Sequence, residues 1–264
     1  MHDQGGAGVK VTMFSEQQKI ASVHIPKTAG TTLRKFWTDL YGPENVYLYF
    51  EDSRQFLRSC DSGIIDRTNP AVLFVRDILF SLNLQPLYRR IADSVRKHEK
   101  TTESSLLPGD FAVVHGHFTA DFISGIDPTL RLVTVIRDPL ERALSHYFYW
   151  NKFASIDSKP KPEGYYFGMS FEEFSELPEM INFQTKYLGS RNISDFKYVG
   201  VTEQLDRYCR YFDPNGKIPQ FRLNTTKRSP INLSDDFVAS FRQANYSDYQ
   251  LYETALQFQE RITA

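Results

Sequence analysis

The stretch from Ser22 to Trp37 constrains the fold of this chain more than any other, because three structural signals follow one another in it. An apolar, partly β-branched run, Ile20 to Ile25, ends at Pro26. The compact turn Lys27-Thr28-Ala29-Gly30-Thr31-Thr32 comes next, and apolar residues then recur at three- and four-residue spacing, which is typical of a helix. A strand, a tight turn and a helix in this order direct several backbone N–H groups and the positive end of a helix dipole at one position, which suits a phosphate.

The side chains of this turn add to the anion-binding character of its backbone. Lys27 contributes a positive charge, and Thr28, Thr31 and Thr32 contribute hydroxyl donors. The turn is not a Walker A loop, because that motif needs a glycine well upstream of the lysine and Val23 to Pro26 contain none. Taken alone, the stretch leaves open an ordinary strand-to-helix turn with a solvated lysine.

The bulk composition excludes several classes of protein. At 264 residues the chain is long enough for one large α/β domain or two small ones. Its formal net charge of -1 gives no overall attraction to nucleic acid or to an anionic membrane, so we expect no nucleic-acid partner and only a local anion site. The cysteines, Cys60 and Cys209, lie far apart without C-x-x-C spacing, which indicates neither a metal nor a redox site and leaves one disulfide open.

No apolar run approaches the ~18 residues needed to span a bilayer, and the N-terminus lacks a basic-then-apolar signal pattern. We therefore expect a soluble chain without stable membrane insertion. A cytoplasmic protein and a trimmed Golgi-lumenal domain both fit, and the compartment stays unknown at this stage. The oligomeric state also stays open, with a homo-oligomer as one possibility.

The rest of the chain predicts a single α/β domain over 19–264, preceded by a polar tail at 1–18. Strands are expected to alternate with helices, which gives a central parallel sheet with helices on both faces. The expected strands are Val46–Phe50, Ala71–Val75, Phe111–Val114, Leu130–Ile136 and Tyr198–Val201. The expected helices are Leu84–Val95, one starting at Pro139, Ser170–Leu177, Glu179–Leu188, one capped by Thr202 and running to Phe212, and a closing region capped by Ser234.

Three of these strands end in residues that carry chemistry. Lys27-Thr28 follows the first, His115-Gly116-His117 follows the strand at Phe111–Val114, and Arg137-Asp138-Pro139 follows Leu130–Ile136. Ligands of such sheets bind beyond the carboxyl ends of the strands, so we expect these residues to share one site. Ser145 lies two helical turns beyond Arg137. A guanidinium grips phosphate oxygens in a fork, so Arg137 and Ser145 can hold a second phosphate.

Each of these residues also has a plain structural interpretation. Arg137 can pair with Asp138 or Glu141. His115 and His117 lie two apart, so one or both can face the packed side of the sheet. His24 is interpreted as a structural residue or a hydrogen-bonding prop. No third His or Cys stands at ligand spacing, so no metal site is expected.

These segments together resemble sulfotransferases that use 3'-phosphoadenosine 5'-phosphosulfate (PAPS), and specifically the carbohydrate sulfotransferases that include the heparan sulfate 2-O-sulfotransferases. H-I-P-K-T-A-G-T-T resembles their 5'-phosphosulfate loop, and H-G-H-F resembles the segment whose second histidine is the catalytic base. V-I-R-D-P-L-E-R-A-L-S-H-Y-F-Y resembles the 3'-phosphate motif and is the most specific of these matches. V-G-V-T-E-Q-L, L-N-T-T-K-R and Y-E-T-A-L-Q-F resemble a strand-to-helix junction, a segment near the nucleotide and the terminal helix of that family.

The resemblance implies a P-loop-like sulfotransferase fold and roles for individual residues. His117 and Lys27 are the expected catalytic residues, with His117 as general base, and His115 and His146 are candidate contacts to the acceptor substrate. Gly30 stands where the 2-O enzymes usually have serine, and Asn224 where they have basic residues, which bears on the acceptor more than on the cofactor. The implied cofactor-binding residues are Lys27, Thr28, Ala29, Gly30, Thr31 and Thr32 for the 5'-phosphosulfate, Arg137 and Ser145 for the 3'-phosphate, and Thr225, Thr226 and Lys227 closing over the nucleotide.

The predicted function is therefore in-line transfer of a sulfuryl group from PAPS to a hydroxyl of a carbohydrate, with an anionic glycan among the candidate acceptors, without a metal and with 3'-phosphoadenosine 5'-phosphate (PAP) as product. Acceptor specificity is expected in the loops at 51–70, 97–108 and 152–168. A P-loop kinase is one rival, opposed by the missing upstream glycine and the lack of an acidic Mg²⁺ ligand after a strand. A non-catalytic phosphonucleotide-binding protein is another, opposed by His117 beside Lys27, since binding alone needs no base.

Overall fold

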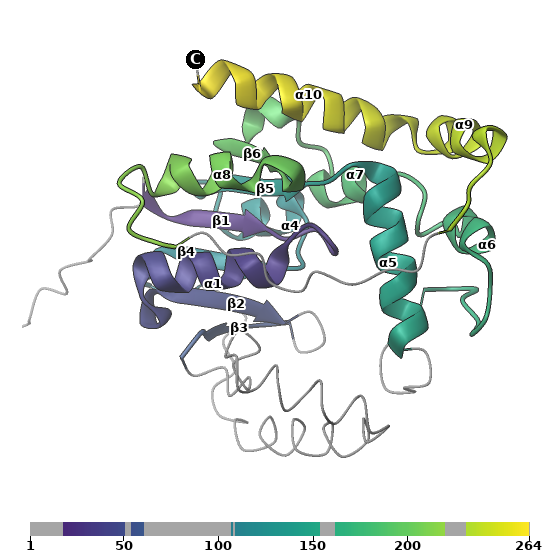
Figure 1. Cartoon of the computed structure of the whole chain (residues 1–264). Coiled ribbons are helices and arrows are strands. Elements are labelled where there is room, and N and C mark those ends of the chain that lie inside the picture. Colours follow the sequence, from purple (N-terminus) through teal and green to yellow (C-terminus); the bar gives the residue numbers. More distant parts are fainter. Residues whose placement is uncertain are drawn as a thin grey trace, which may run out of the picture.

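The computed structural model describes residues 18–50, 54–60, 107, 109–153, 162–219 and 231–263. Within these ranges the chain forms one α/β domain around a mostly parallel sheet with the strand order β3-β2-β4-β1-β5-β6 (Figure 1). β3 runs antiparallel to β2, and all other neighbours pair in parallel. The strands are β1 Ile20–Val23, β2 Val46–Phe50, β3 Gln55–Arg58, β4 Val113–Gly116, β5 Arg131–Ile136 and β6 Tyr198–Val201.

Most predicted strands are confirmed, and one boundary is wrong in an informative way. β4 ends at Gly116, so His115 and Gly116 belong to the strand instead of following it. A Cβ on Gly116 would lie 2.7 Å from Cβ and 2.9 Å from the carbonyl oxygen of Tyr49 on β2, so only glycine lets the two backbones approach this closely. β3 had no periodic signal in the sequence. The predicted strand at 71–75, the predicted helix at 84–95 and nearly all of the predicted tail at 1–18 lie outside the described residues.

Helices cover both faces of the sheet, as predicted. On one face, α1 (Gly30–Tyr41) and α8 (Leu205–Phe212) pack in a buried cluster that includes Leu33, Trp37 and Tyr208. On the other face, α4 (Ala120–Ile126), α7 (Phe183–Leu188) and α10 (Tyr246–Thr263) share a second cluster. Among the described residues the sheet is therefore a central layer between helices, and a ligand can approach at the carboxyl ends of its strands.

One helix stands apart from the two layers. α5 (Pro139–Phe153) begins at Pro139 as predicted and runs across the carboxyl end of the sheet (Figure 1). It packs against α6 (Phe171–Glu176) and α9 (Asp235–Ala244) in a third cluster, in which Trp150, Phe174 and Phe241 are buried. This position brings one side of α5 next to the strand ends that the sequence marks as chemical.

The helix caps agree with the sequence in part. Ser234 caps α9 by accepting a hydrogen bond from Phe237 N, as expected. Thr202 does not cap a helix, because its hydroxyl donates to the carbonyl oxygen of Ile136 at 3.0 Å. A short 3-10 turn, η4 (Thr202–Gln204), precedes α8, and the Thr202 bond joins the end of β6 to the end of β5. Two further 3-10 turns are η2 (Pro43–Asn45) and η3 (Ile193–Asp195). In the part of the chain that the structure describes, no helix has both the length and the apolarity to cross a bilayer.

Candidate functional site

The three chemical strand ends meet at one edge of the sheet. β4, β1 and β5 are adjacent and parallel, so their carboxyl ends lie side by side. His117, just after β4, places Nδ1 3.0 Å from the carbonyl oxygen of His24, just after β1. Arg137, just after β5, places Nη1 3.5 Å from the carbonyl oxygen of Lys27. The candidate base, the lysine turn and the candidate 3'-phosphate arginine are therefore neighbours.

The turn between β1 and α1 owes its shape to local backbone geometry. Lys27 and Ala29 both adopt left-handed conformations, with φ of 74° and 67°. Alternating backbone conformations of this kind gather N–H groups into a concavity that binds anions. Ala29 is the residue before α1 and has no side-chain oxygen to cap the first-turn N–H groups, which is where helices bind phosphate.

Thr28 differs from its predicted role as a hydroxyl donor to a phosphate. Its backbone N–H and its hydroxyl both point to the carbonyl oxygen of Ile25, at 3.3 Å and 2.8 Å. Because both donors are used inside the turn, Thr28 shapes the turn instead of offering hydrogens to a ligand. Thr31 and Thr32 lie in the first turn of α1.

His117 has the tautomer that a general base requires. A carbonyl oxygen can only accept, so the contact between His117 Nδ1 and the carbonyl of His24 requires a hydrogen on Nδ1. In the neutral ring the lone pair is then on Nε2. The carbonyl that orients the ring comes from the residue three positions before Lys27, which links the candidate base to the lysine turn.

His115 is a buried support of this region. Its Nδ1 lies 2.9 Å from Ser22 Oγ. The same oxygen accepts a hydrogen bond from Trp37 Nε1 at 3.2 Å. Burial, followed by the charge of His117, lowers the pKa of His115 to about 3, so the ring is neutral at physiological pH. The His115 ring also forms a hydrogen bond with the backbone of Gly30. His115 thus joins β4, β1 and α1 and is buried in this structure, away from the acceptor contact expected from the sequence.

One side of α5 lines the site. Glu141, Ser145 and Tyr149 are spaced by four residues and so lie above one another on the helix. Arg137 Nη2 donates to Glu141 Oε2 at 3.1 Å, which confirms the pairing that the sequence left open. Lys27 Nζ lies 4.4 Å from the centre of the Tyr149 ring. Ser145 stands between these two contacts, on the side of α5 that faces Arg137 and Lys27.

The neighbouring side of α5 is structural. Arg142, His146 and Trp150, again four apart, point into the cluster with α6 and α7. Arg142 Nη1 lies 3.1 Å from His146 Nδ1, and its guanidinium stacks 4.1 Å from the centre of the Phe183 ring. Burial, and then the charge of Arg142, hold the pKa of His146 well below its usual value. His146 is therefore packed beneath the site in this structure, although the sequence made it a candidate acceptor contact.

The backbone of Arg137 is held from a distant part of the chain, and sequence reasoning missed this support. Gln184 on α7 accepts from Arg137 N at 2.9 Å and donates to Arg137 O at 2.8 Å, so its amide pairs with that residue as a neighbouring strand would. Asp248 on α10 accepts from Gln184 N, Thr185 N and the Thr185 hydroxyl at 2.7–3.0 Å. Tyr149 was missed as well, although its four-residue spacing from Ser145 was a usable signal.

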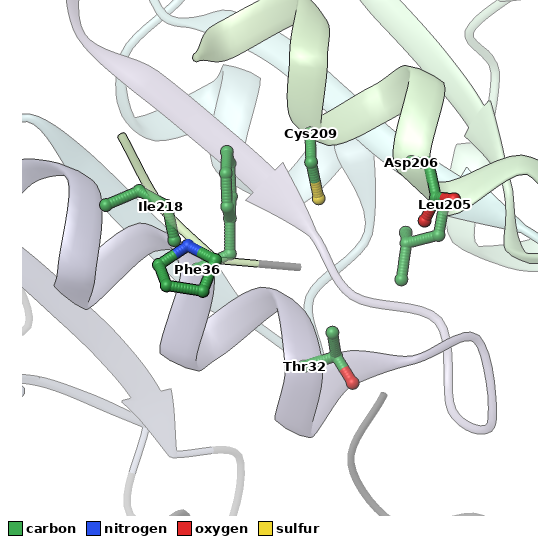
Figure 2. A pocket seen from close by; sticks show the side chains of 7 residues that line it. Thr32, Phe36, Leu205, Asp206, Cys209 and Ile218 are labelled. Carbon is green, nitrogen blue, oxygen red and sulfur yellow. The ribbon is translucent and has the colours of Figure 1, made fainter. Parts of the chain in front are cut away.

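A pocket opens beside the first turns of α1. Figure 2 shows the Cys209 side chain pointing into it from α8, opposite Thr32 and Phe36 of α1. Burial, together with Asp206 and Asp213, raises the pKa of the Cys209 thiol to about 12, so it remains protonated and unreactive. Within the described residues, neither Cys60 nor Cys209 takes part in a disulfide. The pocket is lined by Thr32, Phe36, Leu205, Asp206, Cys209, Ile218 and Pro219.

Two further predictions concern groups outside this geometry. Thr225, Thr226 and Lys227 lie outside the described residues. Among the residues that the structure does describe, no cluster of three or more His, Cys, Asp or Glu side chains is arranged to hold a metal ion.

One family of known proteins matches most of this chain. The model of the sulfotransferase family matches residues 10–255. No curated protein matches the sequence. Among solved structures, a sulfotransferase from Alicyclobacillus acidocaldarius superimposes with a TM-score of 0.42 at 15% identity, over 90% of this chain and 95% of that one. A likeness at that score supports no conclusion about residues.

Proposed function

Because this chain belongs to the sulfotransferase family, whose members transfer sulfuryl groups, we propose that it moves a sulfuryl group from PAPS to a hydroxyl of a carbohydrate. The observation that carries the proposal is the meeting of three groups: His117 Nδ1 lies 3.0 Å from His24 O, and Arg137 Nη1 lies 3.5 Å from Lys27 O. A base, a cation at a helix N-terminus and a phosphate-gripping arginine are what transfer from a bisphosphorylated donor needs.

The donor fits across three neighbouring strand ends. Its 5'-phosphosulfate belongs at the turn after β1, where Lys27 and the first N–H groups of α1 meet. Its 3'-phosphate belongs at Arg137 and Ser145 after β5. The adenine of the donor then extends towards β6, where the pocket between α1 and α8 has apolar walls. There the carboxylate of Asp206 can accept a hydrogen bond from the exocyclic amine of the adenine. We expect Thr225, Thr226 and Lys227 to close over the nucleotide.

The residues of the chain divide the chemistry between them. His117 Nε2 takes the proton of the acceptor hydroxyl while its oxygen bonds to sulfur, a contribution of roughly 10²–10⁴-fold. Lys27 and the N–H groups of the turn stabilise the negative charge that develops on the phosphate oxygen as the sulfur–oxygen bond breaks. The donor supplies the activated sulfuryl group, and PAP is the product. No step requires a metal ion.

The acceptor enters from the side of His117 and Tyr149. The aromatic ring of Tyr149 lies beside Lys27 and is suited to packing against a sugar ring. The carbohydrate class rests on the resemblance of the motifs to carbohydrate sulfotransferases. An anionic glycan is the acceptor we would test first.

Calorimetric titration with PAP and with ATP, each with and without Mg²⁺, tests the donor. We expect metal-free binding of PAP that is lost in Arg137→Ala. Arg131→Ala is the matched control, because Arg131 lies at the other end of the same strand and should leave PAP affinity unchanged. Preference for ATP with Mg²⁺ would favour a P-loop kinase and overturn the proposal.

Activity assays then separate an enzyme from a non-catalytic binding protein. With PAPS and a panel of glycans, we expect sulfate transfer by the wild type and a loss of roughly 10²–10⁴-fold in His117→Ala. PAP affinity should persist in that variant, because His117 acts on the acceptor. Tight PAP binding without transfer to any hydroxyl acceptor would leave only a binding function.

A further inference from the structure

His24 has a side chain that its structural role does not explain. Its backbone is fully engaged, since N donates to Gly116 O at 2.8 Å and O accepts from His117. The ring lies between two other imidazoles, with its centroid 4.4 Å from that of His117 and 5.2 Å from that of His115. Within the described part of the chain the ring makes no hydrogen bond, and its Nδ1 is buried without a partner. An apolar ring would fill this space equally well.

The position of the ring explains why residue 30 is glycine. A Cβ on Gly30 would overlap the imidazole of His24, with Nε2 as the nearest atom. Gly30 is the first residue of α1, and Cα–Cβ bonds in a helix tilt towards its N-terminus. Nε2 of His24 therefore lies at the N-terminal end of α1, next to the turn that carries Lys27.

The buried Nδ1 indicates which nitrogen carries the hydrogen. A hydrogen on Nδ1 would make it a buried donor without an acceptor, and orphaned donors are rarer and more costly than under-used acceptors. The hydrogen is therefore assigned to Nε2. Burial, and then the charges of His117, His115 and Lys27, hold the pKa of His24 well below its usual value, so the ring is a neutral donor.

We propose that His24 is a donor-binding residue whose Nε2–H hydrogen-bonds an oxygen of the 5'-phosphosulfate at the start of α1. This inference rests on the proposed function and adds a side chain to its site. His24 would contribute a directed N–H beside the full charge of Lys27. Its carbonyl orients the base while its ring contacts the donor, so one residue sets the relative position of both reactants.

Calorimetry with PAP, whose 5'-phosphate represents that of the donor, tests this contact. His24→Phe keeps the ring and its stacking but removes the nitrogen, and we expect PAP to bind about tenfold more weakly. His24→Gln returns an N–H at similar reach and should recover most of the affinity. His146→Phe makes the same exchange at a buried histidine beneath the site and should leave PAP affinity within about twofold.

Nitrogen NMR of histidine-labelled wild type gives a second readout that needs neither activity nor a variant. We expect Nε2 of His24 to carry the hydrogen in the free protein and its resonance to shift when PAP is added. A hydrogen on Nδ1, or no shift at saturation with PAP, would overturn the inference. Loss of binding in Arg137→Ala but not in His24→Phe would refute it and leave the proposed function standing. A wild type that does not bind PAP at all refutes both.

Discussion

The two turns proposed to bind the phosphates of the donor are built in opposite ways. The turn after β1 is shaped by its own residues, with left-handed Lys27 and Ala29 and with Thr28 bonded three residues back to Ile25. The turn after β5 depends on distant segments, because Gln184 holds the backbone of Arg137 from 47 residues away. The difference shows that the shape of the Lys27 turn is a local property of the sequence, whereas the position of Arg137 is a property of the whole fold.

The basic side chains of the two turns have different neighbours. Lys27 Nζ lies over the ring of Tyr149, 4.4 Å from its centre. Arg137 lies between two carboxylates, 3.1 Å from Glu141 Oε2 and 4.0 Å from Glu203 Oε1. The arginine is thus held in place before any ligand arrives.

Removal of the distant support should have the largest effect. In Gln184→Met, the N–H and the carbonyl of Arg137 lose their partner, and we expect a loss of about 3 kcal/mol in the free energy of unfolding. PAP should also bind about tenfold more weakly, with little change for adenosine 5'-phosphate, because only the 3'-phosphate needs Arg137. Urea unfolding and calorimetry measure the two quantities.

A second buried glutamine provides the control for this prediction. Gln259 on α10 is as fully buried as Gln184 and places Nε2 3.5 Å from Tyr198 OH, away from the strand ends. Gln259→Met should reduce stability without changing the ratio of the two nucleotide affinities. If both variants lower that ratio equally, Gln184 is no more than a structural residue and the contrast between the turns is lost.

The sequence could predict the local turn and much of the fold for the same reason. Hydrophobic periodicity and turn residues report on neighbours in the chain, which is enough for the strands, for α5 and for the Lys27 turn. Periodicity cannot predict that Gln184 and Asp248 support Arg137, since no regular spacing links residue 137 to residues 184 and 248. β3 was missed because Gln55–Arg58 has only two apolar residues and no alternation, whereas the equally short edge strand β6 is buried at all four positions.

At the site, too, the sequence predicts what depends on neighbours in the chain and misses what depends on burial. His117 and Arg137 could be predicted as site residues because each directly follows a strand. His115 and His146 were assigned as acceptor contacts, yet both are buried, since nothing in their spacing reveals which side of an element is covered. The role proposed for His24 needed the position of Gly30 in three dimensions.

An added methyl group should disrupt the local turn, with a smaller effect. In Gly30→Ala the new Cβ meets the ring of His24, which His115 and His117 hold in place, and we expect a loss of about 2 kcal/mol in the free energy of unfolding. In a His24→Ala background the same change should cost almost nothing, and urea unfolding of the four proteins gives the coupling.

The control for this steric effect is a glycine with room around it. A Cβ on Gly125, within α4, has no heavy atom within 4 Å, so Gly125→Ala should raise stability by about 0.5–1 kcal/mol. An equal cost of Gly30→Ala in both backgrounds would show that the strain does not come from His24.

Acid should weaken both turns, and this is the smallest of the expected effects. A buried neutral histidine underlies each turn, His115 the first and His146 the second, and the ring of His24 lies beside the first turn as well; burial lowers the pKa of all three. The unfolded chain takes up a proton at each ring below about pH 6.5, whereas the folded His115 does so only near pH 3. The contribution of each histidine to stability is therefore fully present above about pH 6.5 and falls as the pH drops, by about 1.4 kcal/mol per pH unit.

His115→Gln and His146→Gln should each make the free energy of unfolding less sensitive to pH, by about 1.4 kcal/mol between pH 7.5 and 5.5 in urea titrations. If a variant keeps the pH dependence of the free energy of unfolding of the wild type, the histidine it lacks is protonated as readily in the folded as in the unfolded chain. The two turns would then differ in their response to acid.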